Sequence, residues 1–114
     1  SATNAEQYEA VGLLCRDVII SLAQSVYDRA RHTPRDGIEP SETDAKRMLE
    51  AYIAEELAGG TNEEVRRLAN AALRLANALT HRRKATFRDA AMCVEATTTV
   101  INVIAIVAGK RDPQ

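Results

Sequence analysis

Four polar side chains recur along one face of a segment whose composition predicts a helix. Asn70, Arg74, Asn77 and His81 follow one another at steps of four, three and four residues, which keeps side chains on one face of an α-helix. An imidazole can exchange a proton near neutral pH, and a guanidinium can bind two oxygens of a phosphoryl group. Solvent-facing positions usually carry Glu and Lys, so this strip predicts a lined groove or a polar interface.

A second polar strip is expected on the segment 86–108. In an antiparallel helical hairpin, Glu95 would approach Arg74 as a supporting residue, and Arg88 would lie near His81. Two interpretations are open: the strips line a functional site, or they are structural polar groups in which ion pairs and asparagine hydrogen bonds set the helix register. The second strip consists of Arg88, Glu95, Thr99 and Asn102.

Arg74, His81 and the six residues between them resemble the Arg–(four to six residues)–His signature of HEPN domains. These are small helical bundles of prokaryotic toxin, abortive-infection and CRISPR-linked ribonucleases. The resemblance implies metal-independent RNA cleavage at a dimer interface. It assigns proton transfer to His81, phosphate binding to Arg74 and substrate positioning to Asn77. Leu75 stands where the family often has a polar residue beside the arginine.

RNA binding would extend beyond these three residues. Asn70 lies on the same strip, and the basic residues after His81 would attract the RNA backbone in a salt-sensitive way. The alternative is a solvated loop whose positive charge suits the C-terminal end of the preceding helix. No zinc spacing, di-iron motif or phosphate loop is present, so we expect no metal and no cofactor. The basic residues are Arg82, Arg83, Lys84 and Arg88.

Four helices must position these groups, over residues 4–31, from residue 41 to Gly59, over residues 61–81 and over residues 86–108. Ser41 and Thr86 are expected to cap the second and fourth helices, and Thr61 to form a capping box with Glu64. His32 falls in a polar loop and is expected at the surface. The buried side of the third helix is predicted as Val65, Leu68, Ala72, Leu75 and Leu79.

Composition predicts an all-α protein, a four-helix up-down bundle that forms a single domain over residues 1–114. Because the chain starts without Met, we expect it to be processed, tagged or cut from a longer chain. Two cysteines, Cys15 and Cys93, fall in apolar runs and are predicted to be small core residues in a cytoplasmic protein. Residues 61–114 carry nine Lys or Arg against five Asp or Glu, which points an anionic partner toward that half.

The segment 90–108 is apolar almost all round. Glu95 and Asn102 argue against a membrane span, so we expect a central helix that a second subunit also covers. The leading hypothesis is a homodimeric HEPN-like ribonuclease, or a domain derived from one, in a bacterial defence or toxin context. The alternative is a non-catalytic helical module for dimerisation or for binding a protein partner such as an antitoxin.

Overall fold

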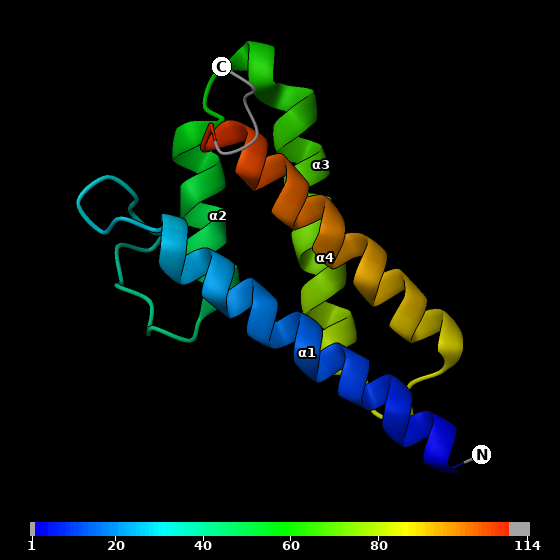
Figure 1. The fold of residues 1–114 in the computed structure, drawn as a ribbon. Coiled ribbons are helices and arrows are strands. Elements are labelled where there is room, and N and C mark those ends of the chain that lie inside the picture. The colour runs from blue at the N-terminus through cyan, green and yellow to red at the C-terminus, as the bar shows by residue number, and fades with distance from the viewer. Residues whose placement is uncertain (1, 110–114) are drawn as a thin grey trace.

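The computed structural model describes residues 2–109, which form four α-helices and no strand (Figure 1). A single 3₁₀ turn, Gly60–Asn62, precedes the third helix. The predicted all-helical class is confirmed. The helices are α1 (Ala2–Val26), α2 (Ala45–Glu56), α3 (Glu63–Thr80) and α4 (Phe87–Val107).

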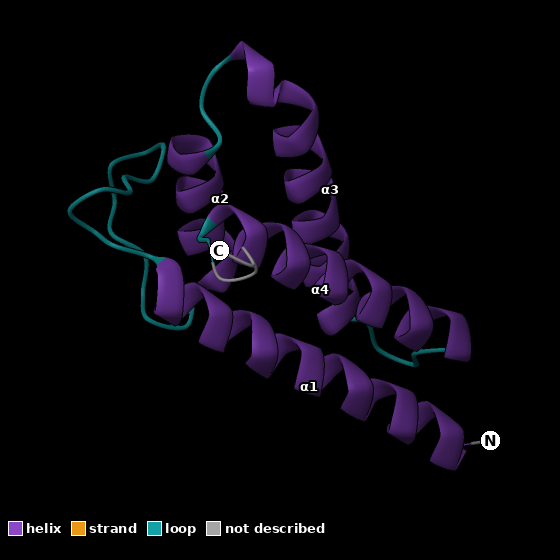
Figure 2. Ribbon diagram, turned by 45° about the horizontal axis from the view of Figure 1, so that its top comes forward, coloured by secondary structure: helices purple, strands orange, loops and turns teal. Residues whose placement is uncertain are grey.

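The longest helices, α1 and α4, lie side by side with their N-terminal ends together (Figures 1 and 2). At those ends the rings of Tyr8 and Phe87 meet edge to face, with centroids 6.0 Å apart. Nearby, the backbone N–H of Lys84 donates to Glu9 Oε1 at 2.8 Å. α3 packs extensively on α4 and also touches α1, while α2 packs against α1 and α3. This arrangement leaves one side of α4 uncovered by the other helices.

The core is aliphatic and draws on all four helices. Its largest fully buried side chains include Leu49 and Ile53 from α2, Leu73 from α3, and Ile104 from α4. Removing such a side chain from water contributes about 1.5–3 kcal/mol. A smaller cluster contains Cys15, Leu79 and Cys93. Both cysteines are free and buried, as predicted.

The buried side of α3 agrees with the prediction at Ala72 and Leu79, but the predicted Val65, Leu68 and Leu75 are exposed. Leu68 and Leu75 are 52% and 39% exposed, whereas Leu73 is only 1% exposed. Leu73 lies among Ala69, Ala72 and Ala76, and this alanine-rich face lets the neighbouring helices approach more closely than the face that carries Leu68 and Leu75. The polar strip is therefore beside the buried face, next to Leu73, and not on the far side of the helix. The buried residues of α3 are Ala69, Ala72, Leu73, Ala76 and Leu79.

His32 is another correction, because it is 2% exposed and not at the surface. α1 ends at Val26, and the chain then turns so that the His32 N–H donates to the Asp28 carbonyl oxygen at 2.7 Å. The Asp28 N–H donates to His32 Nδ1 at 2.8 Å, and His32 Nε2 donates to Glu56 Oε2 at 2.8 Å. Both ring nitrogens are satisfied, which allows burial and ties the loop to α2.

Of the three predicted helix caps, one is formed. The predicted box at Thr61 is not formed, because the 3₁₀ turn makes Asn62 the N-cap of α3, with no side-chain cap bond. α2 is capped by Asp44, whose carboxylate accepts from the Arg47 N–H at 3.4 Å, and not by Ser41. The Thr86 cap of α4 is confirmed. The backbone N–H of Thr86 donates to Asp89 Oδ2, and this hydrogen bond holds the pKa of the Asp89 carboxyl below its usual range.

Among the described residues, α4 is the one helix whose length and composition would suffice to cross a membrane. A third of its most apolar stretch is buried inside the molecule. Cys93, Val100 and Ile104 from α4 enter the core, as expected for the central helix of a bundle.

Candidate functional site: a groove between α2 and α3

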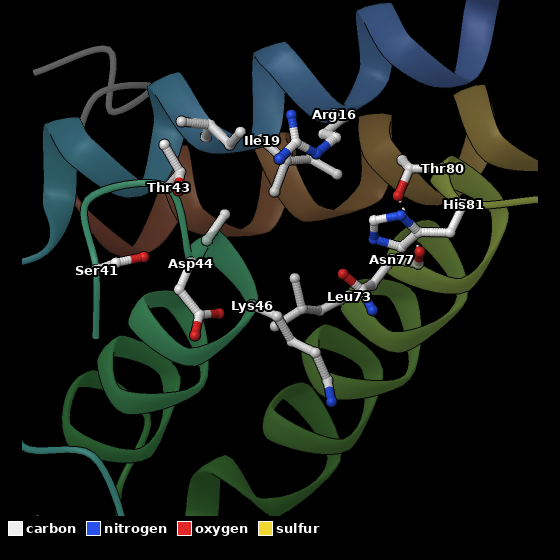
Figure 3. Close-up of a pocket in the computed structure, with 12 residues that line it drawn as sticks. Arg16, Ile19, Ser41, Thr43, Asp44, Lys46, Leu73, Asn77, Thr80 and His81 are labelled. Atoms are coloured by element: carbon white, nitrogen blue, oxygen red, sulfur yellow. Dashed lines mark hydrogen bonds between the residues drawn. The ribbon is translucent and has the colours of Figure 1, made fainter. Parts of the chain in front are cut away.

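A hollow of about 280 Å³ opens where α1, α2 and α3 meet. His81 and Asn77 line it from α3, Arg16 from α1 and Lys46 from the start of α2 (Figure 3). In Figure 3 the His81 ring and the Arg16 guanidinium both extend toward the space between the helices. Ile19 and Leu73 form part of its floor, so polar groups surround an apolar base.

His81 owes its position to the end of α3, where it is the C-cap residue. Thr80 Oγ1 donates to the Asn77 carbonyl oxygen at 2.8 Å and so satisfies one acceptor of the last turn. The His81 side chain is exposed, and Asn77 is half-buried. An exposed imidazole at a helix end can meet a ligand without disturbing the core.

A second, larger hollow of about 670 Å³ lies farther along α2 and α3. Asn70 and Arg74 line it from α3, and Lys46 and Glu50 line it from α2. The loop before α2 closes it with Thr33, Pro34, Arg35 and Asp36.

Lys46 lines both hollows, and we call the two together the α2–α3 groove. All four members of the predicted polar strip line this groove, two in each hollow. No hydrogen bond or ion pair within the described residues joins their side chains to one another. The strip is therefore accessible and not closed by its own polar contacts. Its members are Asn70 and Arg74 in the larger hollow and Asn77 and His81 in the smaller one.

The electrostatics of the groove favour an anion. Over the described residues, the cations Arg16, Arg35, Lys46 and Arg74 have no ion-pair partner within 4 Å. Arg47, in contrast, pairs with Asp36 at 2.6 Å. The Asp44 carboxylate caps α2, and Glu50 neither pairs nor caps. The lining as a whole carries five Lys or Arg against three Asp or Glu, so its net charge is positive and would attract the oxygens of phosphate groups.

The remaining predicted site residues lie outside the groove. Arg82, Arg83 and Lys84 are exposed in the connection after α3, and Arg82 pairs with Asp89 at 3.4 Å. Arg88 and Glu95 are exposed on α4. The predicted approach of Glu95 to Arg74 produces no ion pair among residues 2–109, and Glu95 lines neither hollow.

Sequence reasoning missed the residues that the groove takes from other elements. Arg16 and Lys46 are separated from His81 by 65 and 35 positions in the sequence, and neither belongs to a motif. Lys46 sits in the first turn of α2, where a cation is unfavourable beside the positive helix end. Arg47, in the same turn, pairs with Asp36, whereas Lys46 has no ion-pair partner among the described residues.

Among the described residues, no three His, Cys, Asp or Glu side chains are grouped so that they could hold a metal ion. No protein-family model, curated protein or solved structure matches the chain.

Proposed function

We propose that the chain is a HEPN-like, metal-independent endoribonuclease, or a domain derived from one, that binds RNA in the α2–α3 groove. One observation carries the proposal: the exposed His81 imidazole shares a hollow with Arg16 and Lys46, two cations without ion-pair partners. A proton-transfer group beside free cations is what cleavage of a phosphodiester needs.

The chemistry requires only groups that line the groove and the RNA itself. His81 accepts the proton of a ribose 2′-hydroxyl, and the 2′-oxygen attacks the adjacent phosphorus. Arg16 and Lys46 stabilise the negative charge that develops on the phosphoryl oxygens. The bond to the 5′-oxygen breaks, that oxygen takes a proton from water, and the hydroxide so formed removes the proton from His81. The products are a 2′,3′-cyclic phosphate and a 5′-hydroxyl end.

The rest of the strip would hold the nucleotides next to the cleaved bond. Arg74, in the larger hollow, binds a neighbouring phosphate, and Asn70 and Asn77 donate hydrogen bonds that position the strand. The exposed basic residues after His81 and at the start of α4 extend the path of the backbone. These residues are Arg82, Arg83, Lys84 and Arg88.

The cellular setting is part of the same proposal. A cytoplasmic location fits two free cysteines, and a role in bacterial defence or as a toxin follows only from the HEPN resemblance. We propose a homodimer as well, although the groove is lined by α1, α2 and α3 of a single chain. Cleavage would then need no residue from a partner.

The test uses a fluorescent single-stranded oligoribonucleotide and the intact chain. His81→Ala and His81→Asn should each lower the cleavage rate by about a hundredfold or more, because general acid–base groups contribute that much. Melting temperature should be unchanged, since the side chain is exposed. Wild-type cleavage should persist in a metal chelator and leave a 2′,3′-cyclic phosphate. A substrate with a single 2′-deoxy position should resist cleavage at that position.

Arg67→Ala supplies a matched control, because Arg67 is an exposed cation of α3 outside the groove. It should cleave like the wild type. Cleavage that survives both His81 substitutions would remove His81 from the mechanism, and loss of cleavage with the chelator would refute the metal-free scheme. If RNA binds in the groove and is not cleaved, the protein is an RNA-binding module and not a ribonuclease.

A second candidate function is a non-catalytic module for dimerisation or for binding a protein partner such as an antitoxin. It is favoured by large apolar side chains exposed on α4, including Phe87, Met92, Val94 and Ile106. Such a module needs no chemistry in the groove. An oligoribonucleotide that stays intact in the presence of the protein, together with a stable complex between the protein and its partner, would support this function.

A further inference from the structure

One face of α4 carries an apolar seam that is exposed over residues 87–98 and half-buried at Ile101 and Ala105. Large and small side chains alternate along it at steps of four and three residues, the spacing by which two helices pack along a shared seam. Phe87 is 69% exposed, Val94 is 46% exposed, and Ala91 and Thr98 between them are also exposed. The seam consists of Phe87, Ala91, Val94, Thr98, Ile101 and Ala105.

α1 widens this seam on one side. Leu14 and Val18 are 65% and 44% exposed, and they flank Cys15, which packs with Cys93 of α4. Tyr8 of the same helix contacts Phe87 at the start of the seam. α1 therefore adds exposed apolar side chains to those of α4, and soluble monomers rarely leave many such side chains open on adjacent helices.

Opposite charges border the seam. Arg88 and Glu95 are exposed, lie seven residues apart on the same flank of α4, and have no ion-pair partner within the described part of the chain. Such flanking positions choose the partner and orientation of paired helices. Because the two charges are opposite, two antiparallel copies of α4 would place each Arg88 beside a Glu95.

We propose that this face binds a second copy of the chain, with the two α4 helices antiparallel around a two-fold axis near Met92 and Cys93. In that register Phe87 faces Thr98 of the other copy and Ala91 faces Val94, so within residues 87–98 each large side chain meets a small one, while Ile101 and Ala105 lie beyond the start of the other α4. The same register brings Arg88 close to Glu95 of the other copy twice. Leu14 and Val18 lie level with the axis and add to the contact.

Charge complementarity is what selects a second copy over a lipid surface as the occupant. A bilayer would leave Glu95 in contact with lipid on the same flank as the seam, which is costly. A second copy gives that carboxylate a cation. The dimer does not rest on the proposed ribonuclease activity, because the α2–α3 groove belongs to other helix faces.

The test exchanges charges and measures self-association by sedimentation velocity over a range of concentrations. Arg88→Glu and Glu95→Arg each place like charges together twice and should raise the dimer dissociation constant about tenfold or more. The double variant R88E/E95R restores both pairs and should return the constant to within about threefold of wild type. Glu55→Arg on α2 is the control, because it makes the same charge change as Glu95→Arg at an exposed site outside α4.

Melting curves of all variants check that the fold persists. Val94→Arg, which places a charge in the seam itself, should give a monomer and separates loss of the seam from loss of the charge pairs. A monomeric wild type would overturn the proposal. So would single variants that dimerise normally, a double variant that fails to recover, or a wild type that co-sediments with neutral phosphatidylcholine vesicles instead of pairing.

Discussion

The Cys93 side chain shows how strongly burial controls reactivity in this molecule. It is 1% exposed between α1 and α4, and burial, followed by the adjacent Cys15 thiol, raises its pKa to about 11. A pKa above the usual value keeps the thiol protonated through neutral and mildly alkaline pH, and only the thiolate is a good nucleophile. A nucleophilic role for Cys93 at neutral pH is therefore disfavoured.

We predict that Cys93 reacts at least about tenfold more slowly with an aromatic disulfide reagent at pH 8 in the folded protein than in urea. The Cys15→Ser variant isolates the single thiol, and absorbance of the released thiolate follows the reaction. The difference should shrink as the pH approaches 11. Equal rates in the folded and unfolded protein would show that Cys93 is accessible.

Among the helices, α3 decides most about the candidate site, because its rotation sets where the polar strip lies. Leu73 points into the core while Leu68 and Leu75 remain exposed, so Asn70 and Arg74 border the groove. The opposite rotation, with Leu68 and Leu75 buried, would have turned the strip away from α2.

We predict that Leu73→Ala lowers the free energy of unfolding by about 3 kcal/mol, through lost burial and a cavity. Leu68→Ala, the matched change at an exposed leucine of the same helix, should lower the free energy of unfolding by less than about 1 kcal/mol. Urea unfolding followed by circular dichroism gives both values. A larger loss from Leu68→Ala than from Leu73→Ala would restore the rotation first expected from the sequence.

The whole molecule presents two surfaces of different chemistry on different helix faces. The α2–α3 groove is cationic, and the seam on α4 is apolar with one charge pair. Salt should weaken RNA binding in the groove much more than self-association through the seam. Counterion release governs phosphate binding, whereas apolar contacts are insensitive to screening.

We predict that raising salt from about 50 to 200 mM weakens binding of single-stranded RNA roughly 50-fold, if four phosphates are neutralised. Self-association should change by less than about threefold over the same range. Fluorescence anisotropy measures the first quantity and sedimentation the second. RNA affinity that is independent of salt would argue against the groove cations as its binding groups.

Local sequence determined the helical class, the Thr86 cap, the burial of both cysteines and the presence of Asn70, Arg74, Asn77 and His81 on one face of a helix. These features depend on neighbours a few residues away, whose spacing the helical period dictates. The prediction for α3 was wrong at Val65, Leu68 and Leu75, because two overlapping faces of this helix carry apolar residues at helical spacing and the sequence contains no local preference between them.

Tertiary structure alone decided which face of α3 is buried, that His32 is enclosed, and that Arg16 and Lys46 line the same hollow as His81. Each of these features depends on packing between segments far apart in the chain. The close approach of alanine-rich helix faces and the pairing of buried polar groups select one rotation of a helix about its axis, where local residue spacing favours none. The sequence therefore predicted one wall of the candidate site, the polar strip of α3, and the other walls come from α1 and α2.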